Sequence, residues 1–312
     1  MDVLSLDGIR LEALSVCVPA HAVVNDEKIT KATGIRRCRR AAPGTTVVDL
    51  CVRAAEKVLA ETGTKPGDVG AVICVSFTQR DRMPCAAVQA QDRLGLPKSV
   101  IAFDVTLACS GWGYGLYLAG LLARQTGRKT LLLDGDVQSA FMDPGDAATA
   151  PLLSDGGTAA LVSPLSAGRP PTEAPWRFAF VADGAKGDAL RLAHGDTIKM
   201  DGFGVFRFVA TDVVGYLRAF LASPDSGFSA FVPHQPNVYM VRQLAKSLGV
   251  SEERTAVSCD ELGNLSSASV PATIAWKGVR GRLLIAGFGG GLSVSLGLMD
   301  VAPDCKLSAL EV

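Results

Sequence analysis

The sequence has no excess of charge of either sign, because 31 Lys and Arg residues balance 31 Asp and Glu residues. Nucleic-acid-binding proteins usually carry a basic excess, so this balance argues against such a partner. No uninterrupted apolar run reaches the roughly 18 residues that a membrane-spanning helix needs. The N-terminus also lacks the basic stretch and apolar core of a signal peptide. We therefore expect a cytoplasmic protein without a membrane span.

Metal-binding and nucleotide-binding patterns are missing as well. The eight cysteines are scattered without a CxxC pair, whereas zinc sites need clustered ligands and disulfide scaffolds are short and cysteine-dense. There are only three histidines, His21, His194 and His234. Neither GxGxxG nor GxxxxGK[ST] opens a predicted helix, which argues against a bound nucleotide. We expect neither a metal nor a tightly bound cofactor.

The chain does contain alternating helical and strand-like segments, and its 312 residues can bury a large core. Helical periodicity or apolar runs mark the elements of the first half. The predicted helices are 47–62, 86–94 and 111–126, and the predicted strands are 69–77, 100–105 and 130–134.

The second half repeats this plan. We predict strands at 228–232, 255–259 and 282–286, with helices at 238–248 and 267–276, and the stretch 164–175 resembles a linker. Cys109 and Asn264 occupy matching places in the two halves, each between the second strand and the following helix. We therefore predict a duplicated, layered α/β fold with halves at 1–165 and 166–312. Coincidental spacing is the alternative.

Cys109 lies where an apolar strand meets the small-residue start of helix 111–126. The positive end of a helix dipole lowers the pKa of a nearby thiol, and the thiolate is the nucleophile. Taken alone, the segment leaves two roles open, a reactive thiol and an inert buried cysteine.

His234 and Asn264 are the other candidates for chemistry. His234 directly follows a predicted strand, and ligand-facing loops of α/β sheets lie at the carboxyl ends of strands. A satisfied structural histidine is the alternative. Asn264 could cap the helix that begins near Ser266, or its amide could donate to a developing oxyanion. The glycines of 287–291 could form a plain turn or bring backbone N–H groups to a substrate carbonyl.

Six segments together resemble the condensing enzymes of the thiolase fold, most closely ketoacyl-acyl-carrier-protein synthase III. They occur in that family's order and spacing at 33–37, 103–113, 154–160, 232–235, 263–266 and 287–291. The resemblance implies a Cys109–His234–Asn264 triad in which Cys109 holds the acyl group. It also implies an oxyanion hole made by the N–H groups of Cys109 and Gly290. His234 and Asn264 would then stabilise the enolate formed from a malonyl thioester, yielding a 3-ketoacyl product.

The resemblance carries further expectations about partners. Acyl groups would arrive on the phosphopantetheine of an acyl carrier protein or on coenzyme A, and the enzyme would be a homodimer in fatty-acid initiation or a specialised pathway. A carrier-protein patch of Arg207, Arg242 and Lys246 would meet the acidic carrier, although each residue could equally belong to a solvated face. The expected substrate pocket includes Met83, Phe203 and Phe288, with Met83 reaching across the dimer interface.

This chain departs from the family where coenzyme A binds. The positions that usually supply an adenine-stacking tryptophan and nearby arginine are matched by Lys28 and Ala32, and Ala147 replaces the second adenine-clamping arginine. These departures favour a carrier-bound acyl donor. Two alternatives remain: an acyltransferase of the same fold that passes the acyl group to an alcohol or amine, and a non-catalytic subunit of a heterodimer. The complete triad argues against the second.

Overall fold

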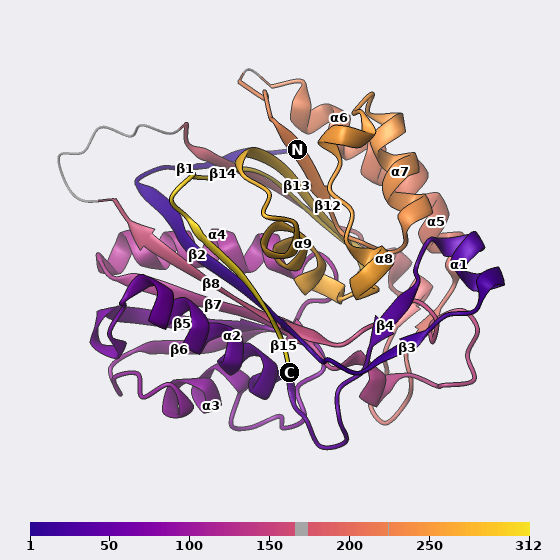
Figure 1. The fold of residues 1–312 in the computed structure, drawn as a ribbon. Coiled ribbons are helices and arrows are strands. Elements are labelled where there is room, and N and C mark those ends of the chain that lie inside the picture. The colour runs from indigo at the N-terminus through magenta and orange to yellow at the C-terminus, as the bar shows by residue number, and fades with distance from the viewer. Residues whose placement is uncertain (166–173, 224) are drawn as a thin grey trace.

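The computed structural model describes residues 1–165, 174–223 and 225–312, and it contains two β-sheets separated by helices (Figure 1). The first sheet has the strand order β15-β2-β8-β7-β5-β6 and the second has the order β1-β9-β14-β13-β12. The strands of the first sheet are β2 (Ile9–Val18), β5 (Val69–Val75), β6 (Ile101–Val105), β7 (Lys129–Asp136), β8 (Gly156–Pro164) and β15 (Lys306–Glu311). Those of the second are β1 (Leu4–Leu6), β9 (Trp176–Ala182), β12 (Ala230–Pro233), β13 (Gly281–Gly289) and β14 (Ser293–Val301).

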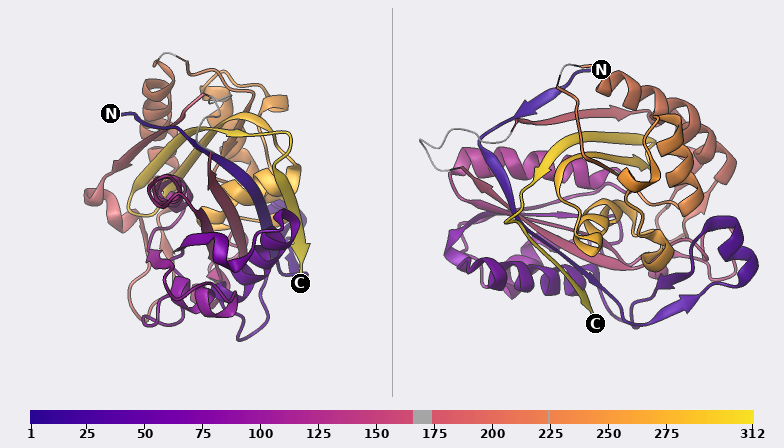
Figure 2. Two further views of the ribbon diagram at one scale, coloured as in Figure 1. Left: turned by 90° about the vertical axis from the view of Figure 1, so that its left-hand side faces the viewer. Right: turned by 45° about the horizontal axis from the view of Figure 1, so that its top comes forward.

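The helices complete a five-layer α-β-α-β-α arrangement, which Figure 2 shows from two further directions. α4 and α9 lie between the sheets, α2 and α3 cover the outer face of the first, and α5 to α7 cover the second. The helices are α1 (Glu27–Thr33), α2 (Val47–Thr62), α3 (Ala86–Arg93), α4 (Gly111–Thr126), α5 (Gly202–Phe208), α6 (Val214–Leu221), α7 (Val238–Ser247), α8 (Cys259–Leu262) and α9 (Ser269–Lys277). Two small antiparallel two-stranded sheets, β3–β4 (Ala22–Val24, Arg37–Arg39) and β10–β11 (Leu190–Arg191, Lys199–Met200), complete the described strands.

The two halves share a strand plan, as the predicted repeat requires. β5 and β7 are parallel and β7 and β8 antiparallel; in the second sheet β12 and β13 are parallel and β13 and β14 antiparallel. The sheets also exchange edge strands, because β15 pairs with β2 and β1 pairs with β9. The predicted 165/166 boundary therefore does not separate the sheets at their edges.

Most predicted elements are confirmed, and helices 47–62 and 111–126 match α2 and α4. The predicted strand 255–259 is wrong. Thr255 forms only an isolated bridge with Phe231, and α8 begins at Cys259. One apolar bridge cannot be told from a short strand by sequence alone, since both have the same local pattern. Most of the predicted linker, 166–173, lies outside the described residues.

Glycines on α4 allow this helix to lie close to both sheets. A β-carbon at Gly111 or Gly115 would overlap Val75 of β5, and one at Gly113 would overlap Ser295 of β14. Along the first turns of α4, the helix backbone therefore packs directly against the two sheets without intervening side chains. This packing fixes the position of the segment just before the helix. In the described part of the chain, no helix is long and apolar enough to cross a membrane.

Candidate active site

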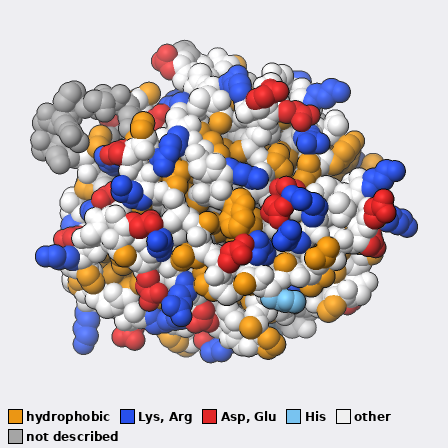
Figure 3. Space-filling model, viewed as in Figure 1, with side chains coloured by type: hydrophobic (Ala, Val, Ile, Leu, Met, Phe, Trp, Pro, Cys, Tyr) orange, Lys and Arg blue, Asp and Glu red, His pale blue; other side chains and the backbone are white. Residues whose placement is uncertain are grey.

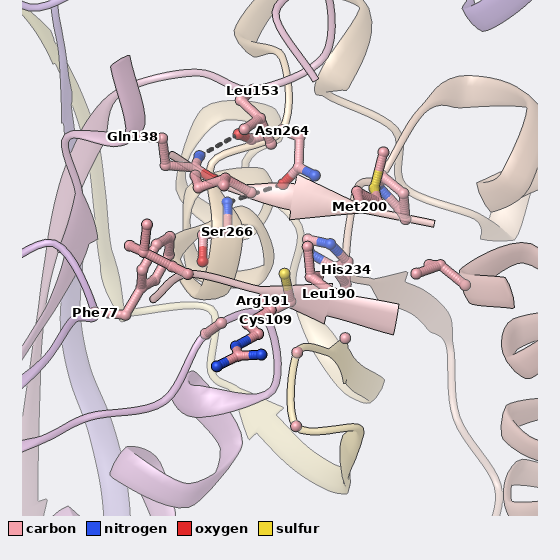
Figure 4. Close-up of a pocket in the computed structure, with 18 of the residues that line it drawn as sticks. Phe77, Cys109, Gln138, Leu153, Leu190, Arg191, Met200, His234, Asn264 and Ser266 are labelled. Carbon is pink, nitrogen blue, oxygen red and sulfur yellow. Dashed lines mark hydrogen bonds between the residues drawn. The ribbon is translucent and has the colours of Figure 1, made fainter. Parts of the chain in front are cut away.

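A cavity of about 320 Å³ lies where the strand ends of the two halves meet, and it brings Cys109, His234 and Asn264 together (Figure 4). Cys109 comes from the loop after β6, His234 from the loop after β12, and Asn264 from the turn before α9. The other residues that line the cavity are mostly apolar. The three predicted triad residues thus converge on one site, although they are distant in sequence.

Cys109 is held against β13 by glycines. The residue is 8% exposed and lies two positions before the first residue of α4. A β-carbon at Gly289 would come within 2.7 Å of the Cys109 β-carbon and 2.9 Å of its Sγ, and one at Gly287 would meet the Cys109 carbonyl oxygen at 2.9 Å. Only glycine at these positions lets β13 run this close to the thiol. This close approach places the N–H of Gly290 beside Cys109.

The thiol itself does not behave as its place near a helix start predicts. Burial raises the pKa of Cys109 to about 12, and the negative charge of Asp136 acts in the same direction. The Ser266 hydroxyl and the backbone N–H groups of Cys109 and Gly290 act to lower this pKa, but they do not offset the burial. The expected lowering was therefore wrong, because desolvation of a thiolate exceeds the helix dipole here. The pKa of Cys109 thus lies above the ordinary value of a thiol, not below it.

His234 is a neutral ring in an enclosed place. It is 2% exposed, and its backbone N–H donates to the Ala286 oxygen at 2.6 Å, which continues the β12–β13 pairing. Burial lowers the pKa of His234 to about 3, opposed by the Ser266 backbone. The ring meets Phe288 edge-on, and Nδ1 has no partner among the described residues. Because Nδ1 is fully enclosed, Nε2 is the ring nitrogen left to face a ligand, and a neutral imidazole can donate one hydrogen bond from it.

Asn264 is fixed on three sides by hydrogen bonds. Its backbone N–H donates to Leu152 at 2.8 Å, and its backbone oxygen accepts from the Ser154 N–H at 2.9 Å. Its side-chain Oδ1 accepts from the Ser266 N–H at 2.9 Å. The Nδ2 group is then the free end of the amide, and it has only donors. Ser154 belongs to the segment 154–160, one of the six that carry the family resemblance, and it holds the Asn264 backbone in place.

Gln138 also holds Asn264, and the sequence did not single it out. It follows β7, and its Nε2 donates to the Asn264 and Ser154 backbone oxygens, both at 2.7 Å. Figure 4 shows it across the cavity from His234. Its place after a parallel strand was the one available signal, since such loops face ligands.

Two buried carboxyls lie behind the site on β7. Asp136 Oδ1 accepts hydrogen bonds from Ser76, Phe77 and Thr78, at 2.9–3.2 Å. Burial raises the pKa of Asp136 to about 7 despite these bonds. Burial likewise raises the pKa of Asp134 well above its usual range, although the Ser267 hydroxyl donates to it. Both carboxyls therefore ionise less readily than exposed ones, because burial disfavours their charged form.

The other predicted site residues are distributed differently. Phe288 lines the cavity, but Phe203 does not, because its side chain is 75% exposed on α5 while Val205 of the same helix faces inward. Met83 is 84% exposed and does not line this cavity. In the described residues no group of His, Cys, Asp and Glu could hold a metal ion.

The expected carrier patch lies on the surface. Arg207 is on α5, whereas Arg242 and Lys246 are on α7 and line a groove with Lys31 of α1. Arg242 contacts Glu252 at 3.6 Å. On the face in Figure 3, basic and acidic side chains are interspersed and form no continuous basic patch.

Comparison with known proteins identifies relatives along most of the chain. Residues 103–177 match the family described as 3-oxoacyl-[acyl-carrier-protein (ACP)] synthase III, and residues 224–300 match the C-terminal part of the same family. A beta-ketoacyl-[acyl-carrier-protein] synthase III of Natranaerobius thermophilus is 31% identical, covering 86% of this chain and 89% of the relative. Synthase III 2 of Streptomyces coelicolor is 31% identical, covering 92% of each.

Solved structures agree with these sequence matches. A 3-oxoacyl-(acyl-carrier protein) synthase of Burkholderia xenovorans superposes with a TM-score of 0.92 at 30% identity, covering 100% of this chain and 99% of that one. The priming beta-ketosynthase of the R1128 polyketide biosynthetic pathway superposes with a TM-score of 0.83 at 27% identity, covering 97% of this chain and 99% of that one.

Proposed function

Because this chain belongs to the beta-ketoacyl-[acyl-carrier-protein] synthase III family of thiolase-fold condensing enzymes, we propose that it joins an acyl group held on Cys109 to a malonyl unit. The product is a 3-ketoacyl thioester, and the reaction is a decarboxylative Claisen condensation. The observation that carries this proposal is the convergence of Cys109, His234 and Asn264 on one cavity.

The first step is transfer of an acyl group to Cys109. The sulfur attacks the thioester carbonyl, the N–H groups of Cys109 and Gly290 stabilise the oxyanion, and the carrier thiolate leaves. The proton lost by Cys109 ends on that departing sulfur. The close packing of Gly289 against Cys109 supports this oxyanion hole, because it places β13 where the Gly290 N–H reaches the thiol.

The second step uses the two donors that face the cavity. A malonyl thioester enters and loses carbon dioxide, and the enolate oxygen accepts hydrogen bonds from His234 Nε2 and Asn264 Nδ2. The enolate carbon then attacks the acyl-cysteine, and the Cys109 thiolate that leaves regains a proton from water. The low pKa of His234, about 3, supports a neutral donor rather than a general base.

The donor is a carrier protein in preference to coenzyme A. Lys28, Ala32 and Ala147 are exposed, and none of them has a planar group on which adenine could stack. Such stacking contributes about 1–3 kcal/mol per aromatic contact. Arg207, Arg242 and Lys246 are exposed and would meet an acidic carrier, for which Arg242 would exchange its contact with Glu252.

Two copies of the chain form the enzyme. β6 is the edge strand of the first sheet and is largely apolar, and its Ile101 is 42% exposed. An open, apolar edge can pair with another strand. Exposed Met83 would then cover a partner's cavity. We also place the protein in the cytoplasm, and the free state of all eight cysteines supports that placement.

The test is intact-protein mass spectrometry after mixing the protein with acyl-carrier and acyl-coenzyme A thioesters. We expect a mass increase of one acyl group that is absent from Cys109→Ala, with faster acylation by the carrier form. Adding malonyl carrier protein should release a 3-ketoacyl product. Discharge by an alcohol or amine instead would favour the acyltransferase alternative, and equal acylation by coenzyme A would contradict the carrier preference.

A further inference from the structure

Gln138 is a polar side chain in a mostly apolar cavity wall. It is 2% exposed, and both hydrogen bonds of its Nε2 go to backbone carbonyl oxygens, those of Ser154 and Asn264. A carbonyl oxygen can only accept, so the amide nitrogen is identified by its partners. Two N–H groups meet two acceptors, and the donors of Gln138 are fully used.

The other end of this amide is unpaired. Oε1 accepts no hydrogen bond from the described residues, nor is it among the fully enclosed side-chain oxygens that lack a partner. Gln138 lines the cavity that holds Cys109, so the small accessible part of the residue opens there. Most of the lining is apolar, as at Phe77, Leu153 and Ile198, and its polar side chains do not donate to Oε1. A carbonyl-type oxygen in such a wall needs a donor from a ligand or a water molecule.

Gln138 differs in this respect from the residues proposed for catalysis. His234 Nε2 and Asn264 Nδ2 offer donors, which suit the thioester oxygen. Gln138 Oε1 offers only an acceptor, which cannot bind that oxygen and must meet an O–H or N–H group of the substrate.

The charged residues that line the cavity indicate which kind of substrate group can donate a hydrogen bond to Gln138 Oε1. The described residues that line it include no Asp or Glu, and Arg191 is its one cationic lining residue. An ammonium group would enter without a counter-charge, and burying an unpaired charge is unfavourable. A neutral hydroxyl supplies the donor that Oε1 lacks without bringing an unpaired charge into the cavity.

We propose that the acyl group carried by Cys109 bears a hydroxyl that donates a hydrogen bond to Gln138 Oε1. This proposal rests on the proposed function, because it concerns the acyl group that enters the same cavity. Gln138 is thereby a specificity residue: its Nε2 holds the turn of Asn264, and its Oε1 selects hydroxylated substrate.

The test compares acylation of Cys109 by a hexanoyl-carrier thioester with acylation by five isomers that carry one hydroxyl on carbons 2 to 6. For the wild-type protein we expect one position of the hydroxyl to raise the kcat/KM of acylation about tenfold or more over hexanoyl. A site built to bind a hydroxyl rejects the analogue that lacks it, since the protein group is then left unpaired. If no hydroxylated isomer has a higher kcat/KM of acylation than hexanoyl, the proposal is overturned. This comparison uses the wild-type protein alone.

Gln138→Leu tests the residue itself. In this variant, the kcat/KM for the preferred hydroxylated isomer divided by that for hexanoyl should fall to about one or below. Because both substrates are affected alike, this ratio cancels any general loss of activity that follows from losing the hydrogen bond to Asn264. Gln79→Leu is the matched control, because Gln79 Nε2 donates to a backbone oxygen at 2.6 Å but the residue does not line this cavity. A preference that survives Gln138→Leu contradicts the assignment. If neither hexanoyl nor any of the five hydroxylated thioesters acylates Cys109, the proposed function falls as well.

Discussion

The side-chain Oδ1 of Asn264 accepts a 2.9 Å hydrogen bond from the backbone N–H of Ser266, and this bond holds the Nδ2 of the same amide free. The sequence presents capping and catalysis as alternatives for Asn264. In the structure the two ends of one amide divide these roles, because the oxygen holds the turn before α9 and the nitrogen remains for the substrate.

Asn264→Asp should separate the two roles. The aspartate keeps an acceptor for the Ser266 N–H but replaces the Nδ2 donor with an oxygen. We expect release of carbon dioxide from malonyl carrier protein to slow about 100-fold or more, as for loss of an oxyanion donor. Acylation of Cys109 should persist, and radiolabelled malonyl carrier with intact mass spectrometry measures both.

Asn237→Asp is the control for that experiment. Asn237 caps α7 by accepting from the Met240 N–H at 2.8 Å, and an aspartate can do the same. Condensation should therefore be unchanged. Equal loss in the two variants would mean that the effect of Asn264→Asp is general rather than catalytic.

The raised pKa of Cys109 predicts slow alkylation at neutral pH. Because the thiolate is the nucleophile, the rate of iodoacetamide modification at Cys109 should rise about tenfold per pH unit from pH 7 to 10, without a plateau. Peptide mass spectrometry identifies the modified cysteine. A plateau near pH 7 would show a helix-dipole-activated thiolate and contradict the burial argument.

The lowered pKa of His234 predicts an effect on stability in acid. Its pKa is about 3 in the folded protein, against an ordinary value of 6.5, so between these values only the unfolded chain binds this proton. The contribution of His234 to the free energy of unfolding should therefore fall as pH falls through this window, by about 1.4 kcal/mol per unit. Urea unfolding at several pH values measures this contribution as the difference in free energy of unfolding between wild type and His234→Gln. If the free energies of the two proteins change in parallel with pH, the prediction is contradicted.

Gly289→Ala tests the close approach of β13 to the thiol. The new β-carbon would lie 2.9 Å from the Cys109 Sγ, which forces a displacement. We expect acylation to slow about 100-fold, as small misplacements of reacting groups do. Gly184→Ala is the control, since a β-carbon there meets no atom within 4 Å. Acylation at the wild-type rate in Gly289→Ala would rule out this constraint.

Local pattern was sufficient for α2, α3, α4, α7 and α9, whereas α1, α5, α6 and α8 were not predicted. α2 begins at the capping box of Thr46 and Asp49 and ends at Gly63 with φ 64°, and α4 ends at Gly127 with φ 65°. Such start and stop signals lie within a few residues, so they can be read from the sequence. Edge pairing could not be predicted, because the partner of β15 is β2, at the opposite end of the chain.

The sequence by itself determined the family, the repeated strand–helix plan and the three residues that converge on the cavity. These depend on residue types in a fixed order. Only the tertiary structure decided the chemistry of each group, because protonation depends on burial and hydrogen bonding. The pKa of Cys109 is raised because the residue is buried, Asn264 presents a donor because Ser266 engages its oxygen, and Gln138 presents an acceptor because two carbonyls engage its nitrogen.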